Sequence, residues 1–131
     1  MLRLNNKIFL SWDDIHNLVD ILCEKIITEL PNIDSVHGVN RGGLIPAVLI
    51  SHKLNLPWSD VMYPNTLVID DIVDSGFTLK NVVGCYTAAL HYKPHTSCFL
   101  PNLYAGVHTG DEYIYYPWEQ CDSEPIADYL K

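Results

Sequence analysis

The chain has 131 residues, of which 48% are hydrophobic and 18% charged, and these proportions are typical of one compact globular domain spanning 1–131. Sixteen acidic residues against eight basic ones give a net charge of -8, and the basic residues are scattered along the chain. Because nucleic-acid binding depends on clustered lysine and arginine, this distribution argues against a nucleic-acid partner. An anionic ligand would need backbone N–H groups, a metal ion or one or two well-placed cations.

The first predicted element is a helix that begins after Ser11 and ends at Pro31. Ser11 is a favoured N-cap residue, and Asp14 stands three residues later, in the position of a capping box. Apolar residues then follow at the three- and four-residue spacing of an amphipathic helix. They are Ile15, Leu18, Val19, Leu22, Ile26 and Leu30.

Strands and helices alternate through the rest of the chain. The remaining predicted elements are a strand at 36–39, a helix at 44–54, a strand at 66–69, a helix over about 78–90, and strands at 97–100 and 113–116. Because this alternation gives parallel strands joined by crossover helices, we expect an α/β fold with an open, mainly parallel twisted sheet flanked by helices. Ligands of such sheets bind beyond the carboxyl ends of the strands, so the loops that follow the first two strands are the candidate site.

Membrane and secretion signals are not visible in the sequence. The first ten residues lack the apolar stretch of a signal peptide, and the longest apolar run, Leu44–Ile50, is far too short to span a bilayer. The four cysteines form no CxxC pair, so we expect small buried side chains in the reducing cytoplasm rather than zinc ligands.

The most specific motif is the acidic string TLVIDDIVDSGFT, which covers Thr66–Thr78. The adjacent carboxylates of Asp70 and Asp71 repel each other unless ribose hydroxyls or a divalent cation neutralise them. The residues from Ser75 to Thr78 bring backbone N–H groups and hydroxyls to the start of a helix, where a phosphate binds well. For any single residue, a polar turn in which Asp74 or Ser75 caps the next helix is an open alternative.

A second loop, Asn40–Gly43, follows the first predicted strand. Its two glycines permit close approach of a ligand to the backbone. Arg41 is one of two arginines in the chain, and its planar guanidinium suits a bidentate grip on two phosphate oxygens. Taken alone, Arg-Gly-Gly is equally compatible with a plain turn, so its value comes from preceding the acidic string by about thirty residues in an α/β pattern.

These two motifs resemble those of the type I phosphoribosyltransferases, in particular the bacterial xanthine-guanine enzymes, and the resemblance extends from Ile8 to about Pro125. It implies that Asp70 and Asp71 bind the ribose hydroxyls of phosphoribosyl pyrophosphate (PRPP) and that Asp74, the catalytic residue, accepts the N7 proton of the attacking purine. It implies that the 5-phosphate is held by Ser75, Gly76, Phe77 and Thr78. It implies that the pyrophosphate is held by Asn40, Arg41, Gly42 and Gly43.

The segments ALHYKPHTSCFLPNLYAG and EYIYYPWEQ resemble the base-binding end of the same enzymes. The resemblance places Lys93 on purine O6, Tyr113 as the aromatic ring that stacks on the purine, and Ile114 where backbone groups read its exocyclic edge. A planar aromatic face and one placed cation are what an oxopurine needs. The simpler alternatives are a solvated lysine at Lys93 and an aromatic-rich edge or subunit interface around Trp118.

The resemblance implies a Rossmann-like domain with a small hood from the C-terminal segment, and purine salvage as the function. The reaction is phosphoribosyl transfer from PRPP to xanthine, guanine or hypoxanthine, with Mg²⁺ bound through PRPP and Asp70 or Asp71 as its candidate protein ligands. A cytoplasmic homodimer or homotetramer is expected.

The family's long mobile segment before the acidic strand is reduced here to Pro57–Asn65, which contains no lysine or arginine. A segment this short is a weak candidate for a lid that closes over the site. A second hypothesis is therefore a non-catalytic regulatory module of the same fold that binds a nucleotide or PRPP.

Overall fold

A four-stranded parallel sheet forms the centre of the computed structural model, which describes residues 1–119. Its strand order is β3-β4-β5-β6, and every neighbouring pair is parallel. These strands are β3 (Ser35–Gly38), β4 (Thr66–Val73), β5 (Tyr86–Tyr92) and β6 (Leu103–Val107). The predicted parallel α/β sheet is therefore confirmed.

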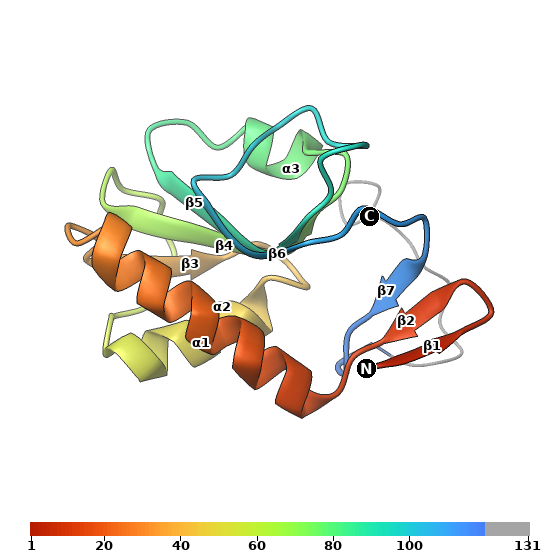
Figure 1. Ribbon diagram of the computed structural model, residues 1–131. Coiled ribbons are helices and arrows are strands. Elements are labelled where there is room, and N and C mark those ends of the chain that lie inside the picture. The colour runs from red at the N-terminus through yellow and green to blue at the C-terminus, as the bar shows by residue number, and fades with distance from the viewer. Residues whose placement is uncertain (120–131) are drawn as a thin grey trace.

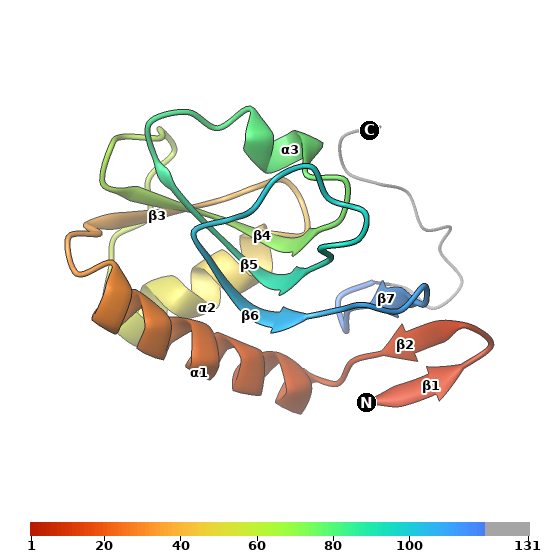
Figure 2. The same ribbon diagram turned by 45° about the horizontal axis from the view of Figure 1, so that its top comes forward.

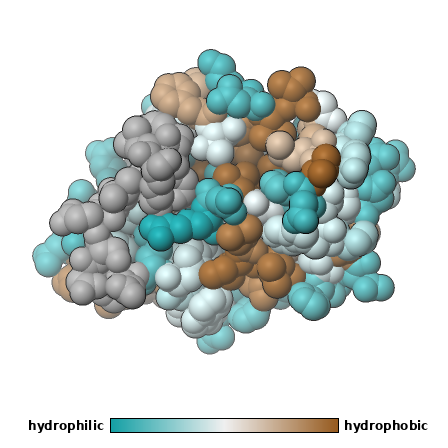
Figure 3. Space-filling view, turned by 180° about the vertical axis from the view of Figure 1, so that it is seen from behind, coloured by the Kyte–Doolittle hydropathy of each residue, from teal (hydrophilic) through white to brown (hydrophobic). Residues whose placement is uncertain are grey.

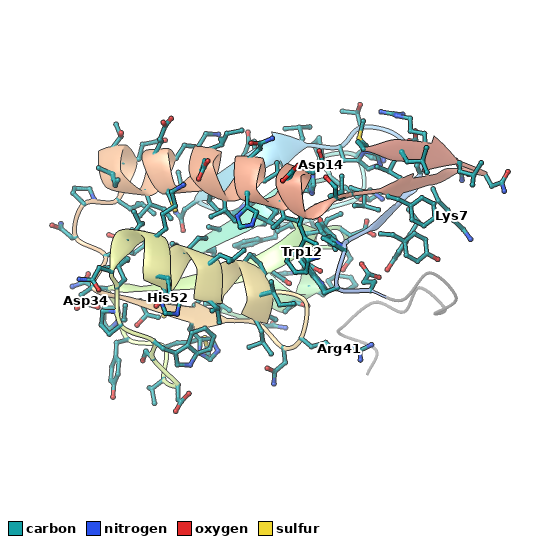
Figure 4. All side chains as sticks on the ribbon, turned by 90° about the horizontal axis from the view of Figure 1, so that it is seen from below. Lys7, Trp12, Asp14, Asp34, Arg41 and His52 are labelled. Atoms are coloured by element: carbon teal, nitrogen blue, oxygen red, sulfur yellow. The ribbon has the colours of Figure 1, made fainter. Side chains whose placement is uncertain are left out.

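Two long helices cover one face of this sheet, and one short helix lies on the other (Figures 1 and 2). The helix α1 (Trp12–Glu29) begins with the expected capping box: the Asp14 amide donates to Ser11 Oγ (3.1 Å), and the Ser11 amide donates to Asp14 Oδ2 (2.9 Å). The helix α2 (Leu44–Leu54) has the predicted bounds and packs on β3 and β4. Figure 4 shows the two helices side by side.

A second, three-stranded sheet stands beyond one end of the main sheet and is called the hood here (Figure 1). It has the order β1-β2-β7, with β1 (Leu2–Leu4), β2 (Lys7–Phe9) and β7 (Tyr113–Tyr115). The strand β7 is the predicted C-terminal contribution. The N-terminal hairpin of β1 and β2 was not predicted.

Three predictions about the elements are wrong. The helix expected over 78–90 is limited to the four residues of α3 (Phe77–Lys80), and the last five positions of that stretch, 86–90, belong to β5. The stretch 97–100 is not a strand and lies in the loop between β5 and β6. There the Ser97 hydroxyl donates to the carbonyl of Phe99 and accepts from its amide, so the backbone of Phe99 bonds a side chain. The strand β4 continues to Val73, so Asp70 and Asp71 lie within it and do not follow its end.

The apolar core has two parts, one on each face of the main sheet. The larger part lies between the sheet and the two long helices, and the smaller part, under α3, contains Val68, Val73, Leu79 and Ala89. Apolar residues also reach the surface, where Figure 3 shows them interspersed with hydrophilic ones. Within residues 1–119, no helix has the length and apolar character needed to cross a membrane.

Candidate functional site

The Asn40–Gly43 loop and the acidic strand β4 meet, as the sequence predicts. The amide of Val39 donates to the carbonyl of Ile69 (2.9 Å), which holds the start of the loop against β4. Gly42 lies so close to Asp71 that a Cβ added there would be 2.6 Å from the carboxyl carbon. The peptide between Asn40 and Arg41 is cis. The candidate pyrophosphate loop and the candidate ribose carboxylates therefore form one site.

The two adjacent carboxylates are largely shielded from solvent, because Asp70 is 5% exposed and Asp71 is 8% exposed. Buried carboxylates require hydrogen-bond donors, and the strand supplies two of them. The Asp71 amide donates to Asp70 Oδ1, and the Ile72 amide donates to Asp71 Oδ1, both at 2.8 Å. The backbone thus fixes the directions of both carboxylates before any ligand arrives.

The residues after Val73 turn into α3 as a compact loop. Gly76 adopts a φ of 87°, and a Cβ on it would lie 2.7 Å from Ser97 Oγ, so glycine is required for both reasons. Ser75 Oγ accepts from the Phe77 amide (3.3 Å), and the Ser75 carbonyl accepts from the Cys98 amide (2.9 Å). Ser75, Gly76, Phe77 and Thr78 therefore lie together in the turn where a 5-phosphate is expected.

The structure brings Lys93 beside Asp74, although nineteen positions separate them in the sequence. Lys93 Nζ lies 3.5 Å from Asp74 Oδ1, and the Lys93 amide donates to the carbonyl of Val73 (3.0 Å). The side chain of Lys93 is only 12% exposed, whereas that of Asp74 is open to solvent. Thr96, which belongs to none of the predicted site motifs, donates its hydroxyl to Asp74 Oδ1 at 2.8 Å.

The hood brings the aromatic residues of β7 toward the acidic strand. The Tyr113 hydroxyl donates to Glu119 Oε2 (3.2 Å). Burial raises the pKa of Tyr113, and the negative charges of Glu119 and Asp71 raise it further, which indicates that Tyr113 lies near the acidic strand. Ile114 is buried and pairs with Ile8 of β2.

Arg41 is exposed and extends from the loop that precedes α2 (Figure 4). The described residues contain no cluster of three or more histidine, cysteine, aspartate or glutamate side chains that could by themselves hold a metal ion. The oxygen-donor chemistry of Asp70 and Asp71 suits Mg²⁺, which takes one or two carboxylates together with phosphate oxygens of a substrate.

The segment before the acidic strand runs along the edge of the main sheet. The Val36 amide donates to the carbonyl of Pro57 (3.0 Å), and the Ser59 amide donates to the carbonyl of Val36 (2.8 Å). The Ser59 carbonyl also accepts a hydrogen bond from His37 Nδ1 (2.9 Å). These bonds hold the backbone of residues 57–59 on β3, a strand that neighbours the acidic strand.

Known proteins resemble this chain in sequence and in fold, although no family model matches it. The xanthine-guanine phosphoribosyltransferase of Chromohalobacter salexigens is 24% identical over 98% of this chain and 95% of its own length. The purine phosphoribosyltransferase of Pyrococcus horikoshii has a TM-score of 0.75 and 25% identity, over 95% of this chain and 99% of that one. A hypothetical protein of Neisseria gonorrhoeae, solved with bound ppGpp, has a TM-score of 0.74 and 23% identity, over 92% and 93%.

These similarities confirm that the fold is that of the type I phosphoribosyltransferases. They also confirm that the chain resembles transferases. The more particular resemblance, to the xanthine-guanine enzymes, is confirmed as well and extends over nearly the whole chain.

Proposed function

We propose that the protein transfers the phosphoribosyl group of PRPP to a 6-oxopurine, giving the nucleoside 5′-monophosphate and pyrophosphate. The observation that carries this proposal is the pairing of Lys93 Nζ with Asp74 Oδ1 at 3.5 Å, at the end of the acidic strand. One edge of a 6-oxopurine presents O6, an acceptor, beside N7–H, a donor. A lysine and a carboxylate side by side match that edge, whereas the C6 amino group of adenine would meet the lysine donor with another donor.

The other subsites follow from the loops that meet at β4. Asp70 and Asp71 accept hydrogen bonds from the ribose hydroxyls, and the turn from Ser75 to Thr78 holds the 5-phosphate through its N–H and hydroxyl groups. Asn40, Arg41, Gly42 and Gly43 bind the pyrophosphate. Support for this division comes from the closeness of Gly42 to the Asp71 carboxylate, which is the arrangement expected if pyrophosphate and ribose bind side by side.

The chain's own residues then carry the reaction. Arg41 and the backbone donors of its loop stabilise the negative charge that develops on the pyrophosphate as the C1–O bond of the ribose breaks. Asp74 takes the N7 proton while N9 attacks C1, with Thr96 and Lys93 holding the carboxylate in place. Tyr113 stacks on the purine, and backbone groups of Ile114 read its exocyclic edge. Asp70 or Asp71 would be the protein ligand of Mg²⁺ bound with PRPP, and the ion would supply positive charge to the leaving group.

The broader setting is purine salvage in the cytoplasm by a homodimer or homotetramer built from one domain per chain. Xanthine, guanine and hypoxanthine are the candidate bases. Analytical ultracentrifugation measures the oligomeric state, and a competition among the three bases measures the preference.

A second candidate function is a regulatory module that binds a nucleotide or PRPP without turnover. The observation that favours it is the short segment Pro57–Asn65, a weak candidate for a closing lid, whose residues 57–59 are hydrogen-bonded to β3. The gonococcal protein of the same fold was solved with ppGpp, so a guanine nucleotide is a reasonable probe for this function.

One experiment separates the two candidates. The protein is incubated with PRPP, Mg²⁺ and each base in a spectrophotometric assay, and the binding of PRPP, GMP and ppGpp is measured by calorimetry. Turnover with a 6-oxopurine supports the transferase. Tight binding of GMP or ppGpp without any turnover supports the module and refutes the transferase.

A further inference from the structure

A buried tyrosine that directly follows β7 of the hood bonds to the acidic strand. Tyr116 is 2% exposed, and its ring stacks on Trp118 with centroids 4.9 Å apart. Its hydroxyl donates to the main-chain carbonyl of Asp71 (3.2 Å) and lies 2.8 Å from Nδ1 of His91 on β5. The same hydroxyl therefore joins the hood, the acidic strand and the neighbouring strand.

The bond matters because of the peptide group that it holds. The carbonyl of Asp71 and the amide of Ile72 belong to one rigid, planar peptide unit. That amide donates to Asp71 Oδ1 at 2.8 Å, so the peptide orientation sets the direction of the Asp71 carboxylate. Tyr116 holds the other end of the same unit. A continuous chain of contacts thus runs from the Tyr116 hydroxyl to the carboxylate.

His91 completes the arrangement from β5. The single hydroxyl hydrogen of Tyr116 is used on the Asp71 carbonyl, so the bond to His91 requires the hydrogen on Nδ1 of the imidazole. Burial, together with the charge of His108, lowers the pKa of His91 to about 4, so the ring is neutral near pH 7. A neutral ring with the hydrogen on Nδ1 donates to the Tyr116 oxygen. The hydroxyl hydrogen of Tyr116 then remains directed at the Asp71 carbonyl.

We propose that Tyr116, supported by His91, is the positioning residue of the ribose site, because its hydroxyl fixes the Asp71–Ile72 peptide and through it the Asp71 carboxylate. The inference rests on the proposed function, in which that carboxylate binds the ribose hydroxyls. It also links two subsites: Tyr113, the candidate purine-stacking ring, lies three residues before Tyr116, so the hood that covers the base also orients the ribose carboxylate.

The direct test compares Tyr116→Phe with Tyr115→Phe. Both changes remove one hydroxyl from a buried tyrosine at the end of β7 or just after it, but Tyr115 stacks on Phe9 of β2, with ring centroids 5.1 Å apart. Calorimetry without Mg²⁺ measures the affinity for ribose 5-phosphate, which uses the acidic strand, and for pyrophosphate, which uses the Asn40–Gly43 loop. We expect Tyr116→Phe to weaken ribose 5-phosphate binding about tenfold, the worth of one well-placed hydrogen bond, and to leave pyrophosphate binding unchanged. Tyr115→Phe should change neither affinity.

Steady-state kinetics provide a second test, because a purely structural role would not raise KM while leaving kcat nearly unchanged. Ribose contacts are made in both the ground state and the transition state, so Tyr116→Phe should raise the KM for PRPP about tenfold and leave kcat within about twofold. Unchanged ribose 5-phosphate affinity in a folded Tyr116→Phe protein overturns the inference. Equal losses for ribose 5-phosphate and pyrophosphate overturn it too, because they indicate general damage.

A variant pair at His91 covers the case in which Tyr116→Phe does not fold. His91→Leu removes the Nδ1 donor, whereas the side-chain amide of His91→Asn can place an N–H at the same position. We expect about threefold weaker ribose 5-phosphate binding for the leucine variant and near-parental binding for the asparagine variant. Equal affinities in the two variants overturn the role of His91. A parent protein that binds neither PRPP nor GMP refutes the proposed function itself, an outcome distinct from a parent that binds and variants that bind equally well.

Discussion

Replacing Gly42 with alanine should damage the ribose site from the opposite loop. The added Cβ would overlap the Asp71 carboxylate, because it would lie 2.6 Å from the carboxyl carbon, well inside normal contact distance. Gly42 is buried and its neighbour Gly43 is packed equally closely against Ile69 and Asp70, so the loop has little room to retreat. Either the carboxylate rotates away from the Ile72 amide or the loop moves off β4.

The magnitude follows from the cost of overpacking, which is about 1–3 kcal/mol for one extra methyl group in a filled site. If the binding free energy of PRPP and Mg²⁺ is weakened by the same amount, their affinity falls by about ten- to a hundredfold. Calorimetry with PRPP and Mg²⁺ measures this affinity. Gly106→Ala on β6 is the matched control, since the nearest atom to its Cβ is His91 Cδ2 at an ordinary 3.4 Å. A Gly42→Ala protein that binds PRPP as tightly as the parent would refute the close contact between the Asn40–Gly43 loop and Asp71 of β4.

Three further predictions concern catalysis, folding and pH. Asp74→Asn should keep PRPP affinity and lose turnover by about 10²–10⁴-fold, the usual contribution of a general base, and equal steady-state turnover in parent and variant would remove Asp74 from the mechanism. Ser11→Ala should lower the free energy of unfolding by about 1 kcal/mol in urea titrations because it removes one half of the capping box of α1, and an unchanged denaturation midpoint would contradict that role. The folded state holds the pKa of His91 at about 4 against an ordinary 6.5, so its contribution to stability is fully present above pH 6.5 and is lost as the pH falls toward 4. Between pH 7.5 and pH 4.5 the free energy of unfolding should fall by about 2–3 kcal/mol more in the parent than in His91→Asn, whereas an equal fall in both would contradict the buried, neutral histidine.

The helices α1 and α2 could be predicted because their signals are local. The capping residues Ser11 and Asp14 and the helical spacing after them act within α1 itself, and Asn55, with a φ of 52°, ends α2 as a left-handed C-cap. The strand β5 could not be distinguished from a helix, because its residues Ala88–Leu90 are 0% exposed and therefore show no alternation. A strand buried on both faces and a buried helix have the same apolar pattern, and alanine and leucine favour the helix when read locally.

The hairpin of β1 and β2 did carry a readable signal. Asn5 and Asn6 have positive φ angles of 51° and 63° between the paired residues Leu4 and Lys7, which is the geometry of a tight two-residue hairpin that asparagine favours. A pair of asparagines between short apolar stretches could therefore have predicted it.

The candidate site divides in the same way. The candidate residues of the two motifs are contiguous in sequence and were predicted from those motifs, and Lys93 was predicted from the family resemblance. Thr96 and Tyr116 were missed, because their partners Asp74 and Asp71 are 22 and 45 positions away and only the loop after β5 and the folding of the hood bring them together.

The most direct test of the central claim is ³¹P NMR of the protein with PRPP and Mg²⁺ in the presence of guanine, xanthine, hypoxanthine or adenine. The Lys93–Asp74 pair predicts that PRPP is converted to pyrophosphate and a new phosphomonoester with a 6-oxopurine, in equal amounts, and not with adenine. Conversion with adenine alone, or intact PRPP with every base, would contradict the claim.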